Sequence, residues 1–200
     1  MKCDIRKFFA SINHKILLNI LAEYIPDQNT LWLLEEIVFS FNTKLGVGLP
    51  LGNLTSQLFV NVYMNKFDQF MKHKLKVKKY IRYADDFVII DSNLEYLKNI
   101  VNLVEHFLNT RLDLELHPQK TEIRKLRQGI DFLGYVILPY HIILRTKTKK
   151  RMFRKIKENK VKLNQGLITK DSFNQSIQSY YGILKHCKGY KLKQEINSLY

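Results

Sequence analysis

The chain has few of the residues that mark disulfide-rich, zinc-binding or membrane-spanning proteins. Its 200 residues include two cysteines, four prolines, eight glycines and one tryptophan. Cys3 and Cys187 stand apart, and no Cys-x-x-Cys or His-x-x-x-His pair is present, so neither a disulfide framework nor a zinc site is expected. No apolar run approaches the roughly 20 residues that cross a bilayer, and no signal peptide precedes Asp4. We therefore expect a cytoplasmic protein without a membrane partner.

Acidic residues are scarce in the last third of the chain, which gives the protein an uneven charge. Residues 140–200 contain 15 Lys and Arg against 3 Asp and Glu, whereas residues 1–139 contain 18 against 15. A positive field of this kind attracts polyanions and indicates nucleic-acid binding, with a solvated helical surface as the alternative. The chain is 46% hydrophobic, which is enough to bury the core of one domain with an appendage.

Two adjacent carboxylates, Asp85 and Asp86, lie between two β-prone runs in residues 79–90. Adjacent like charges repel, and apolar flanks raise the cost of keeping both ionised, so a divalent metal would explain the pair well. On a tight hairpin the alternation of side chains would send them to opposite faces, leaving one for the metal and one for support. An ordinary β-turn is the alternative, because Asp favours turns.

Two earlier segments have features that matter only in combination with this pair. Asp4 begins a short apolar strand, which an aromatic pair and a helical stretch follow. Residues 46–57 begin as a loop rich in Gly and Pro, whose backbone can approach a ligand closely. Asn53 or Thr55 can cap the helix that follows, and its amino end suits an anion. Taken singly, the first segment is more typical of an ordinary strand than of a functional site, and the second of an ordinary loop before a core helix.

In chain order, these three segments resemble motifs A, B and C of the reverse transcriptase family. The matching residues are Asp4 with Phe8-Phe9, then Leu49-Pro50-Leu51-Gly52 through Ser56-Gln57, then Tyr83-Ala84-Asp85-Asp86. Residues 112–121 resemble motif D, in which Lys120 matches a lysine near the triphosphate, and residues 130–135 resemble motif E, the primer grip. Without the family, Lys120 reads as a solvated lysine and Phe132 to Tyr135 as a core strand with a turn glycine. The similarity covers nearly the whole chain and weakens after about residue 145.

The sequence pattern predicts an α+β fold, an antiparallel sheet with helices on one face and then a small helical unit. The resemblance implies a polymerase palm over residues 1–144 and a small basic helical thumb over residues 145–200. Helices are expected near residues 12–24, 30–41, 54–73, 93–110, 148–164, 170–181 and 189–198. Strands are expected near residues 3–8, 112–116, 121–125, 131–138 and 141–144, with a hairpin near 79–91. A capping box from Ser92 to Glu95 is expected to begin the fourth of these helices.

The resemblance implies an RNA-directed DNA polymerase that adds deoxynucleoside triphosphates to a primer 3′-hydroxyl. Its partners would be an RNA template and a DNA or RNA primer, with an accessory retroelement protein as a further candidate. Two Mg²⁺ ions, for which Mn²⁺ can substitute, would need hard oxygen ligands. Asp4 and Asp85 are the expected ligands, and Asp86 is expected to support one ion. Lys120 is expected to protonate or stabilise the departing pyrophosphate, which suits a flexible cation.

The resemblance also assigns residues to the nucleotide and to the nucleic acid. Phe9 matches an aromatic steric gate that favours deoxynucleotides, although a buried core phenylalanine is the alternative. The residues expected at the nucleotide are Phe9, Leu51, Gly52 and Gln57. The residues expected at primer and template are Tyr83, Phe132, Leu133, Gly134, Lys149, Lys150, Arg151 and Arg154.

The second motif is most similar to that of bacterial diversity-generating retroelement enzymes. Retroviral and group II intron enzymes usually have Gln before the motif B glycine and Ser-Pro at its end, where this chain has Leu51 and Ser56-Gln57. The family also has a fingers region before motif A, which is absent here, so we expect the chain alone to bind primer–template but to incorporate nucleotides poorly. A non-catalytic nucleic-acid-binding remnant and a group II intron maturase are the alternatives.

Overall fold

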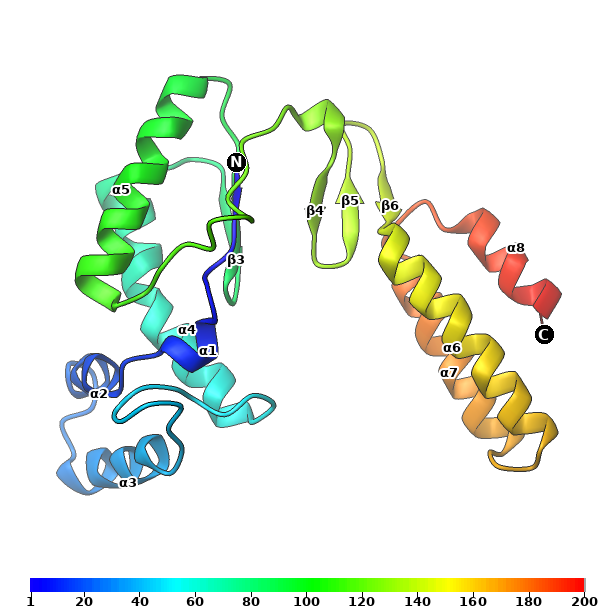
Figure 1. The fold of residues 1–200 in the computed structure, drawn as a ribbon, viewed down its shortest axis with the longest axis horizontal. Coiled ribbons are helices and arrows are strands. Elements are labelled where there is room, and N and C mark those ends of the chain that lie inside the picture. Colours follow the sequence, from blue (N-terminus) through cyan, green and yellow to red (C-terminus); the bar gives the residue numbers. More distant parts are fainter. Residues whose placement is uncertain (200) are drawn as a thin grey trace. The chain divides into compact units, whose positions relative to one another are not determined.

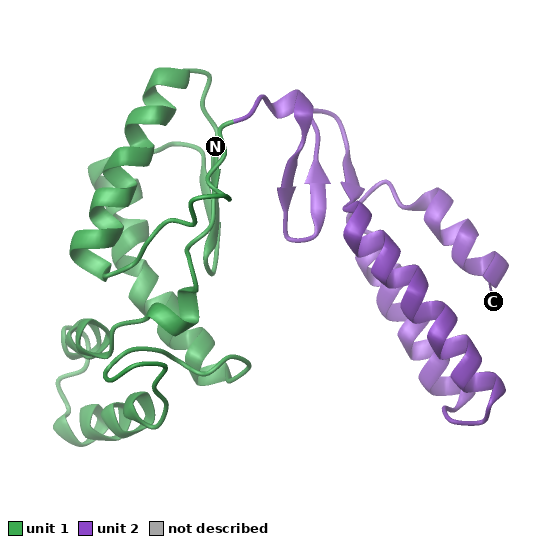
Figure 2. Cartoon of the chain, in the orientation of Figure 1, with its two compact units in different colours: residues 1–123 green, residues 124–200 purple. Residues whose placement is uncertain are grey.

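The computed structural model describes residues 1–199 and shows two compact units, residues 1–123 and residues 124–200 (Figure 2). Both contain helices and a small antiparallel sheet, in agreement with the mixed fold expected from the sequence. The structural boundary precedes residue 144, so the strands expected at 131–138 and 141–144, the end of a palm, belong to the second compact unit. The first of them is divided into two strands by a turn at residues 133 and 134. The functional division into a palm and a thumb stays a prediction.

The first unit is built from a three-stranded sheet and helices that pack beside it (Figure 1). Its elements are β1 (Lys2–Cys3), α1 (Phe8–Ser11), α2 (His14–Ala22), α3 (Gln28–Phe39), α4 (Leu54–Gln69), a π-helical turn (Phe70–Lys74), β2 (Tyr80–Tyr83), β3 (Asp86–Ile89) and α5 (Leu94–Leu112). The strand order is β1-β3-β2, and both pairings are antiparallel. The central strand therefore begins at the second of the two adjacent aspartates.

Side-chain caps explain where three of these helices begin: Asn13 caps α2, Asp27 caps α3 and Asn93 caps α5. Asn13 has an extended backbone, and its side chain accepts from the backbone N–H of Ile16, so the helix expected over residues 12–24 begins as α2 at His14. The strand expected over residues 3–8 ends at Cys3, and the short helix α1 begins at Phe8. Asn93 caps α5 by accepting from the N–H of Tyr96 at 3.0 Å. The capping box expected from Ser92 is therefore wrong by one position.

Aromatic side chains form the centre of the first core. The ring of Phe67 on α4 meets Phe87 of β3 edge to face, with ring centroids 5.1 Å apart. Phe70 stacks on Phe107 of α5 at 4.1 Å, and the hydroxyl of buried Tyr63 donates to the carbonyl of Leu112. This core holds α4 and α5 beside β3, the strand that begins at Asp86.

The second unit contains a separate sheet and three helices (Figure 1). Its elements are a 3₁₀ turn (Leu126–Gln128), β4 (Ile130–Phe132), β5 (Tyr135–Ile137), β6 (Ile142–Leu144), α6 (Thr146–Asn164), α7 (Lys170–Leu184) and α8 (Tyr190–Leu199). Leu144 of β6 shares one core with Met152 of α6 and Ile177 of α7, and Tyr135 packs against that core. This shared core explains why the strands belong with the helices that follow them.

The strands thus form two small sheets, rather than the single sheet that the sequence suggested. The strands expected at 112–116 and 121–125 are reduced to isolated bridges, which pair Leu116 with Ile5 and Glu122 with Lys2. None of the described helices is both long enough and apolar enough to cross a bilayer.

Candidate functional site

Strand pairing brings the three aspartates singled out in the sequence to one end of the first sheet. Cys3 of β1 pairs with Phe87 of β3, so the next residue, Asp4, leaves the sheet beside Asp86. One residue further, the N–H of Ile5 donates to the carbonyl of Asp85 at 3.3 Å. Residues more than 80 positions apart in the sequence therefore place three carboxylates at the tip of one hairpin.

The tip of this hairpin has a strained and well-supported backbone. Tyr83 pairs with Asp86, which leaves Ala84 and Asp85 as a two-residue turn, and Ala84 has a positive φ of 50°. The Arg82 guanidinium donates to the Ala84 carbonyl at 3.0 Å and makes two bonds to the carboxylate of Asp68 on α4, at 2.8 and 2.6 Å. A positive φ at a non-glycine residue costs about 1–3 kcal/mol and persists where surrounding contacts fix it.

The electrostatics of this tip favour a cation. Burial is the main cause that raises the pKa of Asp85, and the nearby charges of Asp4 and Asp86 raise it further. Burial also raises the pKa of Asp86, against the opposing effect of Lys2, whose Nζ lies 3.6 Å from Asp86 Oδ1. That distance is too long for a hydrogen bond, and this buried oxygen has no hydrogen-bond partner among residues 1–199.

Lys120 supplies the closest positive charge to Asp4. Its Nζ lies 3.0 Å from both carboxylate oxygens of Asp4, a side chain that is 12% exposed, while Lys120 itself is 54% exposed. Two backbone bonds position the lysine: the N–H of Lys120 donates to the His117 carbonyl, and the N–H of His117 donates to the Asp4 carbonyl. The structure thus places Lys120 beside the carboxylates, and its expected contact with a triphosphate stays a prediction.

The donor set fits a hard divalent cation, because it consists of carboxylate oxygens, one of them without a hydrogen-bond partner among the described residues. Within residues 1–199, however, no group of three or more His, Cys, Asp or Glu side chains is arranged to hold a metal ion. Both carboxylate oxygens of Asp4 are engaged by Lys120. Asp4 could serve as a ligand only after that ion pair opens.

Phe9 and the loop of the second motif meet through their backbones. Phe9 lies in α1, half-buried, and its ring packs edge to face on Phe8 with centroids 5.5 Å apart. Its carbonyl accepts from the N–H of Leu49 at 2.8 Å. Leu51 is 79% exposed, and Gly52, which has a positive φ of 96°, is exposed as well, so a ligand can reach both.

Two further residues expected at the site are also exposed. Tyr83 is 63% exposed at the end of β2, next to the strained turn. Gln57 lies in the first turn of α4, with its side chain open to solvent. Of the two residues expected to cap α4, Asn53 and Thr55, Asn53 occupies the cap position. Its side chain makes no capping hydrogen bond.

The expected primer grip is a tight turn between β4 and β5 in the second unit. Leu133 and Gly134 both have positive φ, 52° and 84°, as a type I′ hairpin turn requires at its two central positions. Leu133 is 48% exposed, whereas Phe132 is buried in the core. An exposed leucine in this backbone conformation is unusual, because an L-amino acid is strained at positive φ.

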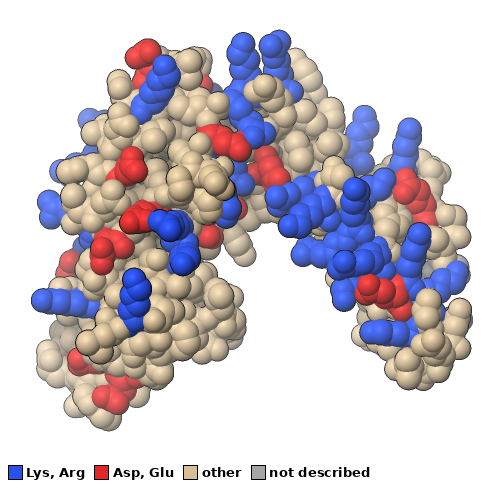
Figure 3. Space-filling view, in the orientation of Figure 1, with Lys and Arg blue, Asp and Glu red and all other residues tan. Residues whose placement is uncertain are grey.

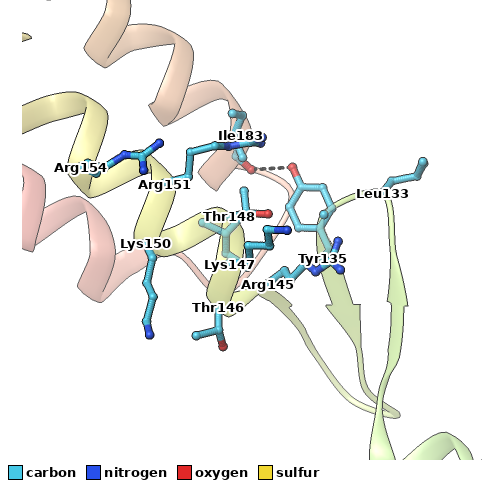
Figure 4. A pocket seen from close by; sticks show the side chains of 12 residues that line it. Leu133, Tyr135, Arg145, Thr146, Lys147, Thr148, Lys150, Arg151, Arg154 and Ile183 are labelled. Carbon is cyan, nitrogen blue, oxygen red and sulfur yellow. Dashed lines mark hydrogen bonds between the residues drawn. The ribbon is translucent and has the colours of Figure 1, made fainter. Parts of the chain in front are cut away.

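This turn and the first part of α6 line a basic pocket of about 1040 Å³ (Figure 4). Its lining side chains include five cations, Arg145, Lys147, Lys150, Arg151 and Arg154. Tyr135 and Ile183 both line the pocket, and the Tyr135 hydroxyl donates to the Ile183 carbonyl at 3.0 Å (Figure 4). The side chain of Lys147 points toward the Tyr135 ring. The sequence analysis missed Arg145, Lys147 and Tyr135, although the first two belong to the same basic run.

Lys149 differs from the other three expected cations of α6. Its Nζ lies 3.6 Å from a carboxylate oxygen of Glu195 and 5.6 Å from the ring centre of Phe153, and it is not among the pocket residues. Arg145 is paired with Asp131 at 2.7 Å. No carboxylate of the described residues forms an ion pair with Lys147, Lys150 or Arg151.

The charge imbalance follows the structural boundary. The first unit contains 15 Lys and Arg against 14 Asp and Glu, while the second contains 18 against 4. Basic side chains gather over the helices of the second unit, on the face shown in Figure 3. This unit therefore has the stronger attraction for a polyanion.

Comparison with known proteins agrees with the motifs of the first unit. A family model described as reverse transcriptase (RNA-dependent DNA polymerase) matches residues 1–137. A COX1/OXI3 intron 2 protein of Saccharomyces cerevisiae is 23% identical, over 79% of this chain and 25% of that protein. Protein YkfC of Escherichia coli is 24% identical, over 68% of this chain and 45% of YkfC. The group II intron-encoded protein LtrA of Lactococcus lactis is 23% identical, over 67% of this chain and 34% of LtrA. The chain thus spans less than half the length of each of these relatives.

Proposed function

Because the chain belongs to the reverse transcriptase (RNA-dependent DNA polymerase) family, we propose that its first unit carries the catalytic carboxylates of an RNA-directed DNA polymerase. The observation that supports this proposal is the convergence of Asp4, Asp85 and Asp86 at one hairpin tip. Three partly buried carboxylates repel one another, so a site of this kind is stabilised by a bound cation.

In this proposal Asp4 and Asp85 hold Mg²⁺, for which Mn²⁺ can substitute, and Asp86 supports the site. Bound divalent ions would activate the primer hydroxyl and neutralise charge on the leaving group. Arg82 positions Asp85, because it fixes the Ala84 carbonyl of the same turn. Lys120, once released from Asp4, has a mobile ammonium group that can donate a proton to the departing pyrophosphate.

The residues around the carboxylates would select the nucleotide. We propose that Phe9 forms a steric gate beside the sugar, and that Leu51, Gly52 and Gln57 face the incoming base pair. Gly52 suits this role, since no atom lies within 4 Å of the position a Cβ would occupy there. A backbone so open can approach a nucleotide closely. Tyr83, exposed beside the turn, would support the primer end.

The second unit would act as the thumb and bind the primer–template duplex. Its basic pocket offers Lys150, Arg151 and Arg154 to phosphates, with Leu133 and Gly134 at the turn beside them. Basic side chains that contact phosphates provide affinity without reading sequence, which suits a polymerase that must move along its template.

A group II intron-type enzyme is the second candidate, because two of the relatives are named as intron proteins. The diversity-generating subgroup rests on Leu51 and Ser56-Gln57 alone and stays a prediction. Near-identical repeats that differ at adenines, beside the gene, would favour the diversity-generating subgroup. A flanking intron would favour the maturase.

Single-turnover extension of a primer on an RNA template, with excess protein and Mg²⁺, tests the proposal. We expect metal-dependent addition of one deoxynucleotide. In Asp85→Asn the rate should fall at least about 100-fold, because a proposed metal ligand is lost; each tenfold corresponds to about 1.4 kcal/mol of transition-state stabilisation. Glu105→Gln, on the exposed face of α5, is the control and should react at the parental rate. Tight binding of primer–template without any addition would favour the non-catalytic alternative.

A further inference from the structure

The loop at residues 43–49 is fixed to the segment that follows Phe9. The N–H of Gly48 donates to the Ile12 carbonyl at 2.8 Å, and the N–H of His14 donates to the Gly46 carbonyl at 3.0 Å. Asn13 and Val47 form an isolated antiparallel bridge. Together with the bond between Leu49 and Phe9, these contacts join two segments that the sequence separates by more than 30 residues.

His14 makes a fully buried side-chain hydrogen bond to this loop. Its ring is 0% exposed, and Nε2 lies 2.6 Å from the Gly48 carbonyl oxygen. A carbonyl only accepts, so Nε2 carries the proton in this bond. The other ring nitrogen, Nδ1, is buried without a hydrogen-bond partner among the described residues, and the ring packs edge to face on Phe39 at 5.3 Å.

The orphaned Nδ1 indicates what the histidine contributes. Burying an unpaired polar atom costs about 1–3 kcal/mol, whereas a leucine could fill a similar volume without that cost. Packing alone therefore does not explain a histidine at this position. What the ring provides, and an apolar side chain cannot, is the short bond from Nε2 to Gly48.

Gly48 is the point at which the loop turns, and its geometry leaves no room for a side chain. Its φ is 111°, and a Cβ there would lie 2.6 Å from Thr43 Oγ1. The Thr43 hydroxyl lies within donor distance of the Ala10 carbonyl, 2.8 Å, and of the Val47 carbonyl, 3.0 Å. Thr43 is exposed, so it forms an outer tie where His14 forms the inner one.

We propose that His14 is a positioning residue that holds the loop against the Phe9 segment and thereby sets the opening between Phe9 and the Leu51–Gly52 turn. The inference rests on the proposed function, which places a nucleotide in that opening. His14 does not touch the nucleotide. It acts through Gly48, because loss of the bond would free the loop to move relative to Phe9.

Amide hydrogen exchange of the full chain tests the clamp without any nucleotide. His14→Leu removes the donor, while His14→Gln keeps an amide N–H that can reach the Gly48 carbonyl. We expect exchange at Gly48 and Leu49 to be at least tenfold faster in His14→Leu and within a few fold of the parent in His14→Gln. Parental exchange in His14→Leu overturns the proposal. Should that variant not fold, His14→Met, a flexible apolar side chain that also lacks the donor, decides, and parental exchange at Gly48 and Leu49 then overturns it.

Incorporation kinetics test the link to selection. In His14→Leu we expect the KM for deoxynucleotides to rise several-fold with a smaller change in kcat, and the use of ribonucleotides relative to deoxynucleotides to rise. His14→Gln should restore both parameters. A fold effect alone would lower kcat without changing the sugar ratio, which would overturn the positioning role. If the parent incorporates no nucleotide, the proposed function fails, and the exchange experiment still decides whether His14 fixes the loop.

Discussion

The ammonium group of Lys120 lies 3.0 Å from both carboxylate oxygens of Asp4, 116 residues away in the sequence. The lysine neutralises the carboxylate that the proposed function assigns to a metal ion. Lysine and ion would therefore compete for one ligand, and release of Lys120 by the metal would free its ammonium group for the triphosphate. A single contact links metal binding to the availability of the proposed general acid.

Replacing Lys120 should separate these two roles. In Lys120→Gln we expect Mg²⁺ and Mn²⁺ to bind several-fold more tightly by titration calorimetry, because the ion no longer displaces a cation. Without metal, the free energy of unfolding should fall by about 1 kcal/mol, since Asp4 is left partly buried and unpaired. Lys98→Gln, which breaks an exposed ion pair with Glu95, should change neither quantity. Unchanged metal affinity in Lys120→Gln would contradict the competition.

Asp85 should destabilise the metal-free protein at neutral pH. Its pKa is raised in the folded state, chiefly by burial, so the folded protein binds a proton more readily than the unfolded chain does. The free energy of unfolding therefore falls as pH rises from the ordinary pKa of an aspartate through the raised value. Asp85→Asn should melt at a higher temperature than the parent at pH 7 in EDTA, and the difference should shrink as the solution is acidified. An equal difference at pH 7 and pH 4 would show that the pKa of Asp85 is not raised in the folded protein.

Phe9→Val tests sugar selection directly. The smaller side chain opens space beside the proposed sugar site, so the incorporation of ribonucleotides relative to deoxynucleotides should rise at least tenfold in single-nucleotide assays. Phe8→Leu is a control in the buried core, and should lower stability without changing the ratio. If the ratio in Phe9→Val equals that of the parent, the half-buried ring of Phe9 is only a packing residue.

Arg82→Lys should weaken the hairpin that carries Asp85. Lysine cannot make the two bonds to Asp68 and the bond to the Ala84 carbonyl together. We therefore expect the free energy of unfolding, measured in urea, to fall by about 1.5–3 kcal/mol. Ala84→Gly should have the opposite or no effect, because glycine adopts the positive φ of this turn without strain. A stability of Arg82→Lys equal to that of the parent would mean that the turn does not depend on the guanidinium.

Salt dependence should identify the cations that contact phosphates. Each contact contributes roughly 0.9 to the slope of log affinity against log salt for duplex nucleic acid. The triple variant Lys147→Gln, Lys150→Gln, Arg151→Gln removes the three pocket cations that form no ion pair with a described carboxylate, and should therefore lower the slope for a primer–template duplex by up to about 2.7. Lys149→Gln, at a lysine already engaged by Glu195, should lower it by much less. Equal slopes in the parent and the triple variant would place the duplex elsewhere.

Local sequence signals predicted most of the fold. The hairpin at 80–89 and the helices α5, α6, α7 and α8 lie where alternation and helical periodicity placed them. The strand expected at 121–125 failed because its backbone contact is a single bridge to Lys2, which depends on the tertiary fold. The division of the strands into two sheets could not be predicted from local sequence either, because it depends on the packing of Leu144 in one core with α6 and α7.

The residues of the candidate site that lie in short sequence motifs could be predicted. The contacts between residues far apart in the sequence could not. Asp4, Asp85 and Asp86 are singled out by their sequence context, and the fold brings them together. Nothing in the sequence near Lys120 or near Asp4 indicates the contact between them. The same holds for His14, which looks like any helix-start histidine until Gly48 is placed against it. Lys149 reads as equivalent to Lys150, and only the position of Glu195 distinguishes them.

The two cysteines have a practical consequence, because one lies in each compact unit. Cys3 is 0% exposed beside Asp4, and burial raises the pKa of its thiol to about 12, so the reactive thiolate is almost absent at neutral pH. Cys187 is only half-buried and packs beside the core of the second unit. A maleimide dye should therefore attach at Cys187 and leave the carboxylate hairpin untouched. The rate at which Cys3 is modified would then measure how often the strand beside Asp4 opens.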